Sequence, residues 1–233
     1  MIKLSRLDAP TPYELWRIEL DAEPSEDELK ILSASERHRA ARIRFQRSRV
    51  RYVSAHCALR LLLSAREGVA ASSLQFKEGD FGKPRLHGRG TSAFSLSHSH
   101  DVALVALTNT GEIGVDVEVL QHIADATALA DHHCTAAERE ALARLEPDDR
   151  GLAFLFCWTR KEACLKAIGR GLNLRPHTFE VGLGSEVRVV TIDTPEGMVW
   201  VEVQSFRYDD SIVASLARVI HASLDFQHGG SVC

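Results

Sequence analysis

The chain has 233 residues, of which 45% are hydrophobic and 26% charged, and its formal net charge at pH 7 is −4. This length allows one large or two small domains, and the charge excludes a generally basic, nucleic-acid-binding protein. The five cysteines form no C-x-x-C pair, which predicts neither a disulfide framework nor a zinc knuckle. The sequence shows no basic leader, and its apolar runs are shorter than the ~18 residues needed to span a bilayer. We therefore expect a cytoplasmic protein with no membrane partner.

The first quarter of the chain predicts one strand followed by helices. Residues 13–20 alternate between apolar and polar, as in a half-buried strand. Capping boxes over 25–28 and 33–36 predict two helix starts, and apolar positions from residue 43 predict one or two long helices ending before Gly68. Arginines crowd the segment 37–60, where acidic residues are nearly absent. They fit either a solvated helix face or a surface for an anion, and both interpretations stay open.

Short strands and turns follow. Residues 74–77 predict a strand, and in the turn over 79–84 Lys83 is held extended by the proline after it. Residues 93–99 and 101–108 predict a hairpin that turns near His98. A turn lysine or loop histidine is most often solvated, so neither side chain indicates a function by itself.

The segment 112–118 alternates strictly, with an isoleucine and two valines on one face and Asp116 and Glu118 on the other. Two carboxylates at i and i+2 stand roughly 7 Å apart at their roots and repel unless water or a cation lies between them. Oxygen ligands of this kind suit Mg²⁺. Taken alone, the pattern also fits a solvated strand edge.

Residues 124–145 predict helices broken near 132–135, where a His-His-Cys run does not indicate zinc because adjacent ligands rarely converge on one metal. Residues 146–150 predict a polar connection. Residues 154–172 predict a helix with a Gly-Arg-Gly stop, in which Glu162 and Lys166 lie one turn apart against apolar surface. A surface ion pair would explain these two charges as well as a site would.

The last part of the chain predicts strands over 178–183, 186–192, 199–206 and 211–217. The segments 101–107 and 210–216 are alike, and each half of the chain has a long helix followed by strands. We therefore expect an α+β fold of two similar halves related by a pseudo-two-fold axis, each a small antiparallel sheet packed with a long helix. The expected boundaries are 1–110 and 111–222, with a flexible tail over 223–233.

Two motifs together resemble a known family. The run from Gly114 to Glu118 (Gly-Val-Asp-Val-Glu), followed roughly forty residues later by the run from Trp158 to Lys166 (Trp-Thr-Arg-Lys-Glu-Ala-Cys-Leu-Lys), is similar to the signature pair of the 4′-phosphopantetheinyl transferases. The Gly-Lys-Pro turn at Lys83 and the Phe-Ser-Leu-Ser-His-Ser run over 94–99 match that family too, and the length resembles its two-half, Sfp-type branch.

The resemblance implies transfer of 4′-phosphopantetheine from coenzyme A to a serine of an apo acyl or peptidyl carrier protein. The reaction would depend on Mg²⁺, with Mn²⁺ as the alternative ion, and release adenosine 3′,5′-bisphosphate. A monomer serving fatty-acid, polyketide or nonribosomal-peptide biosynthesis is implied, with coenzyme A and the carrier as its partners. Neither nucleic acid nor membrane is an implied partner.

The resemblance also implies residue roles. Glu162 would accept the proton of the carrier serine, Lys166 would neutralise phosphate oxygens, and the arginine-rich surface over 37–60 would help to dock the carrier. The implied catalytic residues are Asp116, Glu162 and Lys166, and the implied metal ligands are Asp116, Glu118 and Glu162. The implied coenzyme A contacts are Lys83, Ser97, His98, Asp116 and Lys166 around the diphosphate, and Arg47, Arg51 and Lys77 at the 3′-phosphate or adenine end. This chain departs from the family pattern at Ser95, where asparagine is common, and at Arg170, where glycine or lysine is common.

Two other functions fit part of the pattern. A nucleotide hydrolase or other phosphoryl-transfer enzyme would use the same ion, but the sequence has no G-x-x-x-x-G-K-(S/T) loop and no Rossmann glycine run. A degenerate fold kept as a carrier-binding module is expected to have lost Asp116, Glu162 or Lys166, and all three are present.

Overall fold

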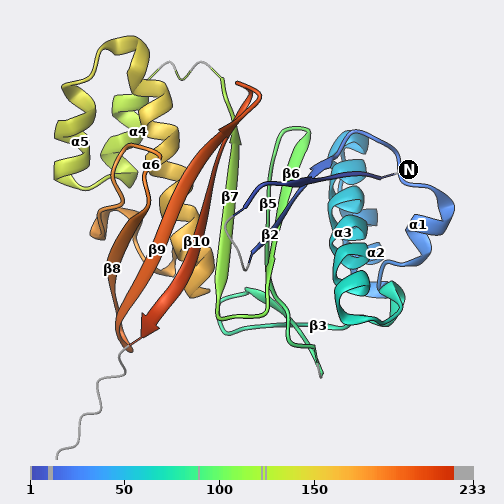
Figure 1. Cartoon of the computed structure of the whole chain (residues 1–233). Coiled ribbons are helices and arrows are strands. Elements are labelled where there is room, and N and C mark those ends of the chain that lie inside the picture. Colours follow the sequence, from blue (N-terminus) through green and yellow to red (C-terminus); the bar gives the residue numbers. More distant parts are fainter. Residues whose placement is uncertain (1, 10–12, 89, 122, 124, 223–233) are drawn as a thin grey trace, which may run out of the picture.

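The computed structural model describes residues 2–9, 13–88, 90–121, 123 and 125–222 and has an α+β fold built on two four-stranded antiparallel sheets (Figure 1). The first sheet has the order β1-β2-β6-β5 and the second β7-β10-β9-β8. Strands of the first are β1 (Lys3–Leu7), β2 (Glu14–Glu19), β5 (Ala93–Ser99) and β6 (Val102–Thr108). Strands of the second are β7 (Ile113–Val119), β8 (Arg188–Thr194), β9 (Gly197–Tyr208) and β10 (Ile212–Ala222). The predicted fold class is confirmed.

Helices flank both sheets, and a small hairpin lies beside them. Between β2 and β5 the chain forms α1 (Glu26–Lys30), α2 (Ala34–Arg42), α3 (Gln46–Glu67) and the hairpin of β3 (Phe76–Glu78) with β4 (Pro84–Leu86). The second half holds α4 (Ala126–His133), α5 (Ala136–Ala143) and α6 (Pro147–Ile168). Short 3-10 turns are η1 (Ala71–Ser73), η2 (Gly171–Asn173) and η3 (Pro176–Thr178). Among the described residues, no helix combines the length and apolar character of a membrane span.

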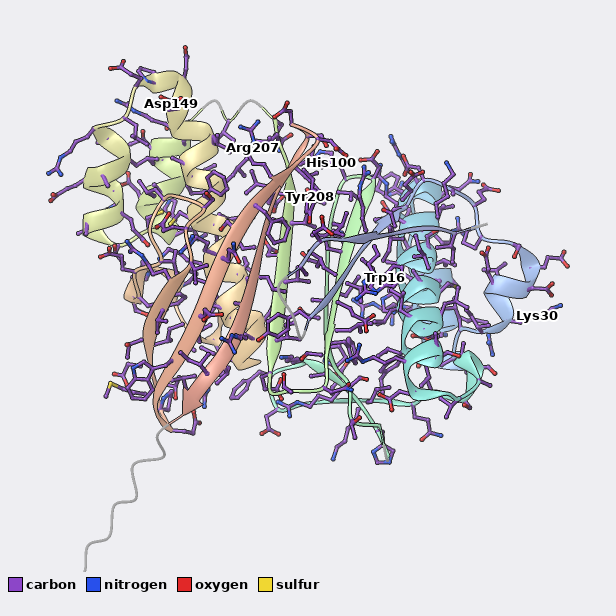
Figure 2. All side chains as sticks on the ribbon, in the orientation of Figure 1. Trp16, Lys30, His100, Asp149, Arg207 and Tyr208 are labelled. Carbon is purple, nitrogen blue, oxygen red and sulfur yellow. The ribbon has the colours of Figure 1, made fainter. Side chains whose placement is uncertain are left out.

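Three large clusters of buried side chains divide the core into layers, and a small fourth cluster joins α6 to β10. One joins α3 to the first sheet, a second joins α6 to the second sheet, and a third lies between the two sheets. Figure 1 shows the resulting order of helix, sheet, sheet and helix, with β7 and β5 near the centre. Side chains fill the space between these layers, and the outer faces carry Lys30 on α1 and Asp149 on α6 (Figure 2). The central position of β5 and β7 is what places the site.

The strands of the first sheet all precede residue 110 and those of the second all follow it. The boundary and the pseudo-two-fold relation between the halves stay predictions. The expected flexible tail, over 223–233, lies outside the described residues.

Capping boxes at Ser25 and Ser33 start α1 and α2 as predicted, since each serine accepts a hydrogen bond from the backbone of the third residue of its helix.

Helix α6 begins earlier than predicted. Its first residue is Pro147, so the expected polar connection over 146–150 is the first turn of the helix. Proline has no N–H to lose at this position, and Asp148 and Asp149 favour the positive end of the helix dipole. The helix ends at Ile168, before Gly169, whose φ of 81° places it in the left-handed region that suits glycine.

The predicted strand over 178–183 is wrong, because side chains rather than a neighbouring strand satisfy its backbone. Glu138 Oε1 accepts hydrogen bonds from the N–H groups of Val181 and Gly182, and Lys161 Nζ donates to the carbonyl of Phe179. Strands β1 and β4 were not predicted. Strand β1 pairs with β2 at the edge of the first sheet, and most of its side chains are exposed, which gives it little periodic signal.

Candidate active site

Strand β7 lies directly against α6 because residue 114 is a glycine. A Cβ at Gly114 would overlap the carbonyl oxygen of Ala163 and the backbone nitrogen of Ala167. The strand therefore approaches the helix backbone at the point where both carry their acidic and basic residues. Alternation along β7 then turns Asp116 and Glu118 toward α6, and helical spacing places Glu162 and Lys166 opposite them.

Asp116 is 5% exposed and bonded on one oxygen only. Its Oδ1 accepts hydrogen bonds from Lys166 Nζ at 2.6 Å and from Ser97 Oγ at 2.7 Å. Its Oδ2 is buried and has no hydrogen-bond partner among the described residues. A buried carboxylate oxygen without a partner is costly, so this atom indicates a missing ligand.

Glu118 is held from two sides. Its Oε2 accepts a hydrogen bond from Ser99 Oγ at 2.7 Å, and its side chain is also bonded to that of Trp158. Burial raises the pKa of Glu118, and the negative charge of Asp116 adds to that effect.

Glu162 and Lys166 do not form the surface ion pair that their spacing allowed. Lys166 Nζ instead reaches across to Asp116 and to Ser97 Oγ, at 2.8 Å from the latter. Glu162 has no hydrogen bond or ion pair within the part of the chain that the structure describes. Burial raises its pKa, and the charge of Asp116 raises it further. A carboxylate with a raised pKa is suited to accept a proton near neutral pH.

A hollow of about 290 Å³ lies over these residues. Its lining includes Ser97, His98, Asp116, Glu118, Glu162 and Lys166. Partial burial and the positive charge of Lys166 lower the pKa of His98, which keeps its ring neutral at neutral pH. The hollow therefore brings together the residues that the sequence predicts to contact the diphosphate and to bind the metal, with the exception of Lys83.

Two further hollows continue from this one along α3 and the β3–β4 hairpin. The first, of about 380 Å³, shares His98 and Lys166 with it. The second, of about 540 Å³, shares Arg39, Tyr52 and His56 with the first. The Arg39 guanidinium lies over the Tyr52 ring, 5.4 Å from its centroid, and the Tyr52 and His56 rings are 4.1 Å apart. Together the three hollows form a path for an elongated ligand.

Four of the predicted coenzyme A contacts either lie outside these hollows or have their donors bound within the protein. They are Arg47, Arg51, Lys77 and Lys83. Arg47 and Arg51 both donate to Asp21, at 2.7 Å and 2.6 Å, although Arg51 is close enough for its charge to lower the pKa of His98. Lys77 is exposed and lines a different hollow.

Lys83 lines the 380 Å³ hollow, but its three N–H donors are used within the protein. Its Nζ donates to Glu112 Oε2 at 2.7 Å and to the carbonyls of Ile113 and Ala167 at 2.9 and 3.1 Å. This geometry opposes the predicted phosphate contact and gives Lys83 a structural role at the junction of the two halves.

The donor set fits a hard divalent cation. Asp116, Glu118 and Glu162 supply oxygen ligands, and the unpartnered Oδ2 of Asp116 and the unbonded carboxylate of Glu162 are available to an ion. Their oxygens do not form a preassembled cluster within 4.8 Å of one another in the described residues.

Another group with metal-ligating atoms does not fit a metal. Cys134, Glu138 and Cys157 place one ligand atom each within 4.8 Å. Both oxygens of Glu138 are already occupied, by the backbone of Thr135 and of Val181 and by the buried ammonium of Lys161 at 2.8 Å. An ammonium at that distance repels a cation, so the group is part of the packing around α6.

Sequence reasoning missed Ser99, Trp158 and Arg39 as residues of this region. The serines at 95, 97 and 99 alternate along β5, and that period of two could have shown that their hydroxyls share a face. Arg39 belongs to the crowded arginine segment, in which no local signal separates it from Arg47 or Arg51.

Comparisons with known proteins show the family of this chain. The family model described as the 4′-phosphopantetheinyl transferase superfamily matches residues 112–215, which include β7 and α6. The 4′-phosphopantetheinyl transferase HetI of Nostoc sp. is 37% identical over 163 residues, covering 68% of this chain and 69% of that protein. The chain belongs to the 4′-phosphopantetheinyl transferase superfamily.

The predicted family is thereby confirmed. Two other members of the superfamily show how the similarity is spread. A putative 4′-phosphopantetheinyl transferase of Synechocystis is 34% identical over 61% of this chain and 59% of its own length. The transferase Sfp of Bacillus subtilis is 23% identical, but the match covers 82% of this chain and 83% of Sfp. A match of that length includes strands of both sheets.

Proposed function

We propose that the chain transfers 4′-phosphopantetheine from coenzyme A to a serine of an apo acyl or peptidyl carrier protein, with Mg²⁺, and releases adenosine 3′,5′-bisphosphate. The observation that carries this proposal is the buried Asp116. One of its oxygens is fixed by Lys166 and Ser97 and the other lacks a partner, in a hollow shared with Glu118 and Glu162. Membership of the superfamily supports the reaction class.

Asp116, Glu118 and Glu162 would hold the ion. When bound there, Mg²⁺ supplies positive charge that offsets the negative charge developing on the diphosphate as the phosphoanhydride breaks. Mn²⁺ has the same preference for oxygen ligands and is the alternative.

Glu162 accepts the proton of the incoming serine hydroxyl, directly or through water. Its raised pKa and lack of a fixed partner support this role. Lys166 uses two of its three N–H donors on Asp116 and Ser97, which leaves one for a phosphate oxygen. Neutral His98, at the junction of two hollows, offers a ring N–H to the diphosphate.

The rest of coenzyme A extends along the two larger hollows. We assign the 3′-phosphate or adenine end to the neighbourhood of Arg39, because its guanidinium lines both hollows and is not engaged by Asp21 as Arg47 and Arg51 are. Arg39→Ala is then expected to raise the KM for coenzyme A more than Arg47→Ala does.

The direct test is the intact mass of an apo carrier protein after incubation with the chain, coenzyme A and Mg²⁺. The proposal expects a gain of one 4′-phosphopantetheine per carrier, and no gain with a chelator or with Glu162→Gln, whose fold is checked by circular dichroism. A phosphoryl-transfer enzyme of another kind would consume coenzyme A without the carrier. A binding module would retain the carrier without changing its mass.

The same assay with several apo carriers assigns the pathway among fatty-acid, polyketide and peptide synthesis. Size-exclusion chromatography tests the expected monomer. The cytoplasmic location stays a prediction that fractionation of the source cells would test.

A further inference from the structure

A row of serine hydroxyls joins the two halves next to the proposed metal ligands. Strands β5 and β7 are edge strands of different sheets. Ser95, Ser97 and Ser99 of β5 reach across to β7, where the oxygen of Ser95 accepts from Val115 N at 3.0 Å and that of Ser99 accepts from Val119 N at 3.2 Å. Side-chain oxygens thus satisfy backbone N–H groups of β7 at this junction.

Ser99 differs from its two neighbours in what else it does. Its hydroxyl accepts from the backbone of Val119, and a hydroxyl has one proton to donate. Glu118 Oε2 is 2.7 Å away and His100 Nδ1 is 3.3 Å away, so the shorter bond to the carboxylate takes the proton. Ser99 is also nearly buried, at 7% exposure, which removes competition from water.

We propose that Ser99 is a positioning residue that fixes Glu118 for a divalent ion. The first half of the chain thereby orients a ligand supplied by the second half. Glu118 has several rotatable bonds, and its other constraint is the side chain of Trp158, on α6. With Oε2 anchored by Ser99, the carboxylate plane is set before an ion arrives. Outer partners of this kind tune metal affinity without touching the metal.

The inference rests on the proposed function of the site but concerns a step that can be measured without any reaction. Ser97 cannot be used to test it, because its hydroxyl contacts both Asp116 and Lys166. Ser99 touches Glu118 alone among the proposed ligands in the described structure. Its bond to the β7 backbone has a match in Ser95, so the comparison with Ser95 isolates the positioning effect.

The test is a titration of the full chain with Mn²⁺, in which electron paramagnetic resonance measures the concentration of the free ion. Ser99→Ala is expected to weaken Mn²⁺ binding about tenfold. Ser95→Ala removes a hydroxyl from the same strand without touching a carboxylate, and is expected to leave Mn²⁺ affinity unchanged. At saturating metal, the transfer rate of Ser99→Ala should return close to that of the wild type, because no reacting group has been lost.

A second pair of variants covers the case in which Ser99→Ala does not fold. Thr and Val have nearly the same shape and both suit a strand, so Ser99→Thr and Ser99→Val differ chiefly in the hydroxyl. The proposal expects Ser99→Thr to bind Mn²⁺ more tightly than Ser99→Val. Equal affinities in that pair, or an unchanged affinity in folded Ser99→Ala, would overturn it. A wild-type chain that binds Mn²⁺ but modifies no carrier would overturn the proposed function. The Mn²⁺ affinities of the Ser99 variants would still decide the role of Ser99 in ion binding.

Discussion

At the scale of single residues, Asp116 combines a firmly bonded oxygen with an unpartnered buried one. Leaving a buried charged oxygen unsatisfied costs roughly 1–3 kcal/mol or more, and an ion that binds only the folded chain recovers that free energy and adds its own. We therefore expect Mg²⁺ to raise the melting temperature and a chelator to reverse the change. Differential scanning fluorimetry would show this, and the same titration on Asp116→Asn should give no shift.

Glu36 is a second acidic residue whose surroundings lead to a measurable effect. It caps α2 and pairs with the buried guanidinium of Arg60 at 2.8 Å, with His56 close by at 3.4 Å. Although burial opposes its ionisation, hydrogen bonds from His56, Ser33 and Arg60 lower its pKa from 4.5 to about 2. Since the folded pKa lies below the unfolded one, this group stabilises the protein fully above pH 4.5 and loses its contribution as the pH falls toward 2.

Glu36→Gln is therefore expected to lower the free energy of unfolding at pH 7 by about 3 kcal/mol, because Arg60 stays buried without its counter-ion. It should also flatten the fall in stability between pH 4.5 and 2. Urea denaturation across that range measures both effects. Glu28→Gln, at the matching capping position of the exposed helix α1, is the control and should lower the free energy of unfolding by about 1 kcal/mol or less. An equal loss of stability in the two variants would contradict the role given to Arg60.

At the scale of elements, the contact between β7 and α6 depends on Gly114. A Cβ at this position meets backbone atoms of the helix, which cannot rotate away as a side chain can. Gly114→Ala should therefore separate the strand from the helix, costing about 3 kcal/mol or more in stability and most of the transfer rate. Gly151→Ala is the control within the same helix, because a Cβ there meets nothing nearer than 3.7 Å. It should leave the rate unchanged and stabilise the chain by about 0.4–1 kcal/mol.

The elements that could be predicted from the sequence are those with a strong local signal. Strict alternation predicted β7 and its faces, and capping boxes predicted the starts of α1 and α2. The strand predicted over 178–183 was wrong because its backbone is bonded by Glu138 and Lys161, which are distant along the chain. Local alternation contains no information about such partners.

At the scale of the whole molecule, Lys83 links the β3–β4 hairpin of the first half to β7 and α6 of the second. Burial lowers its pKa, and Glu112 opposes that effect by supplying a counter-charge. Replacing it by methionine should lower the free energy of unfolding by about 1–3 kcal/mol, since two carbonyls and a carboxylate lose a donor.

The same variant separates two roles for this lysine. If Lys83 is structural, Lys83→Met should change the melting temperature more than it changes the KM for coenzyme A at a temperature where both proteins are folded. Lys77→Met, on the exposed face of the same hairpin, should change neither. A large rise in KM with unaltered stability would restore the phosphate contact implied by the family motif.

How the halves meet could not be predicted from the sequence. The motifs identified Asp116, Glu118, Glu162 and Lys166, because their spacing along one strand and one helix is local information. The path taken by coenzyme A depends instead on which surfaces face each other across the sheets. The resemblance implied Arg47 and Arg51 as contacts from the arginine-rich segment, whereas the structure pairs both of them with Asp21 and places Arg39 at the hollows.

The proposed reaction requires that the carboxylates supplied by β7 and by α6 act on one ion. The measurement that tests this most directly is the transfer rate, by intact mass of the carrier, for Asp116→Asn, Glu162→Gln and the double variant. Residues that act as a unit are strongly non-additive, so each single change should lower the rate at least about a hundredfold and the double variant should be little slower than the worse single one. Losses that multiply in the double variant would show two independent sites and contradict the account.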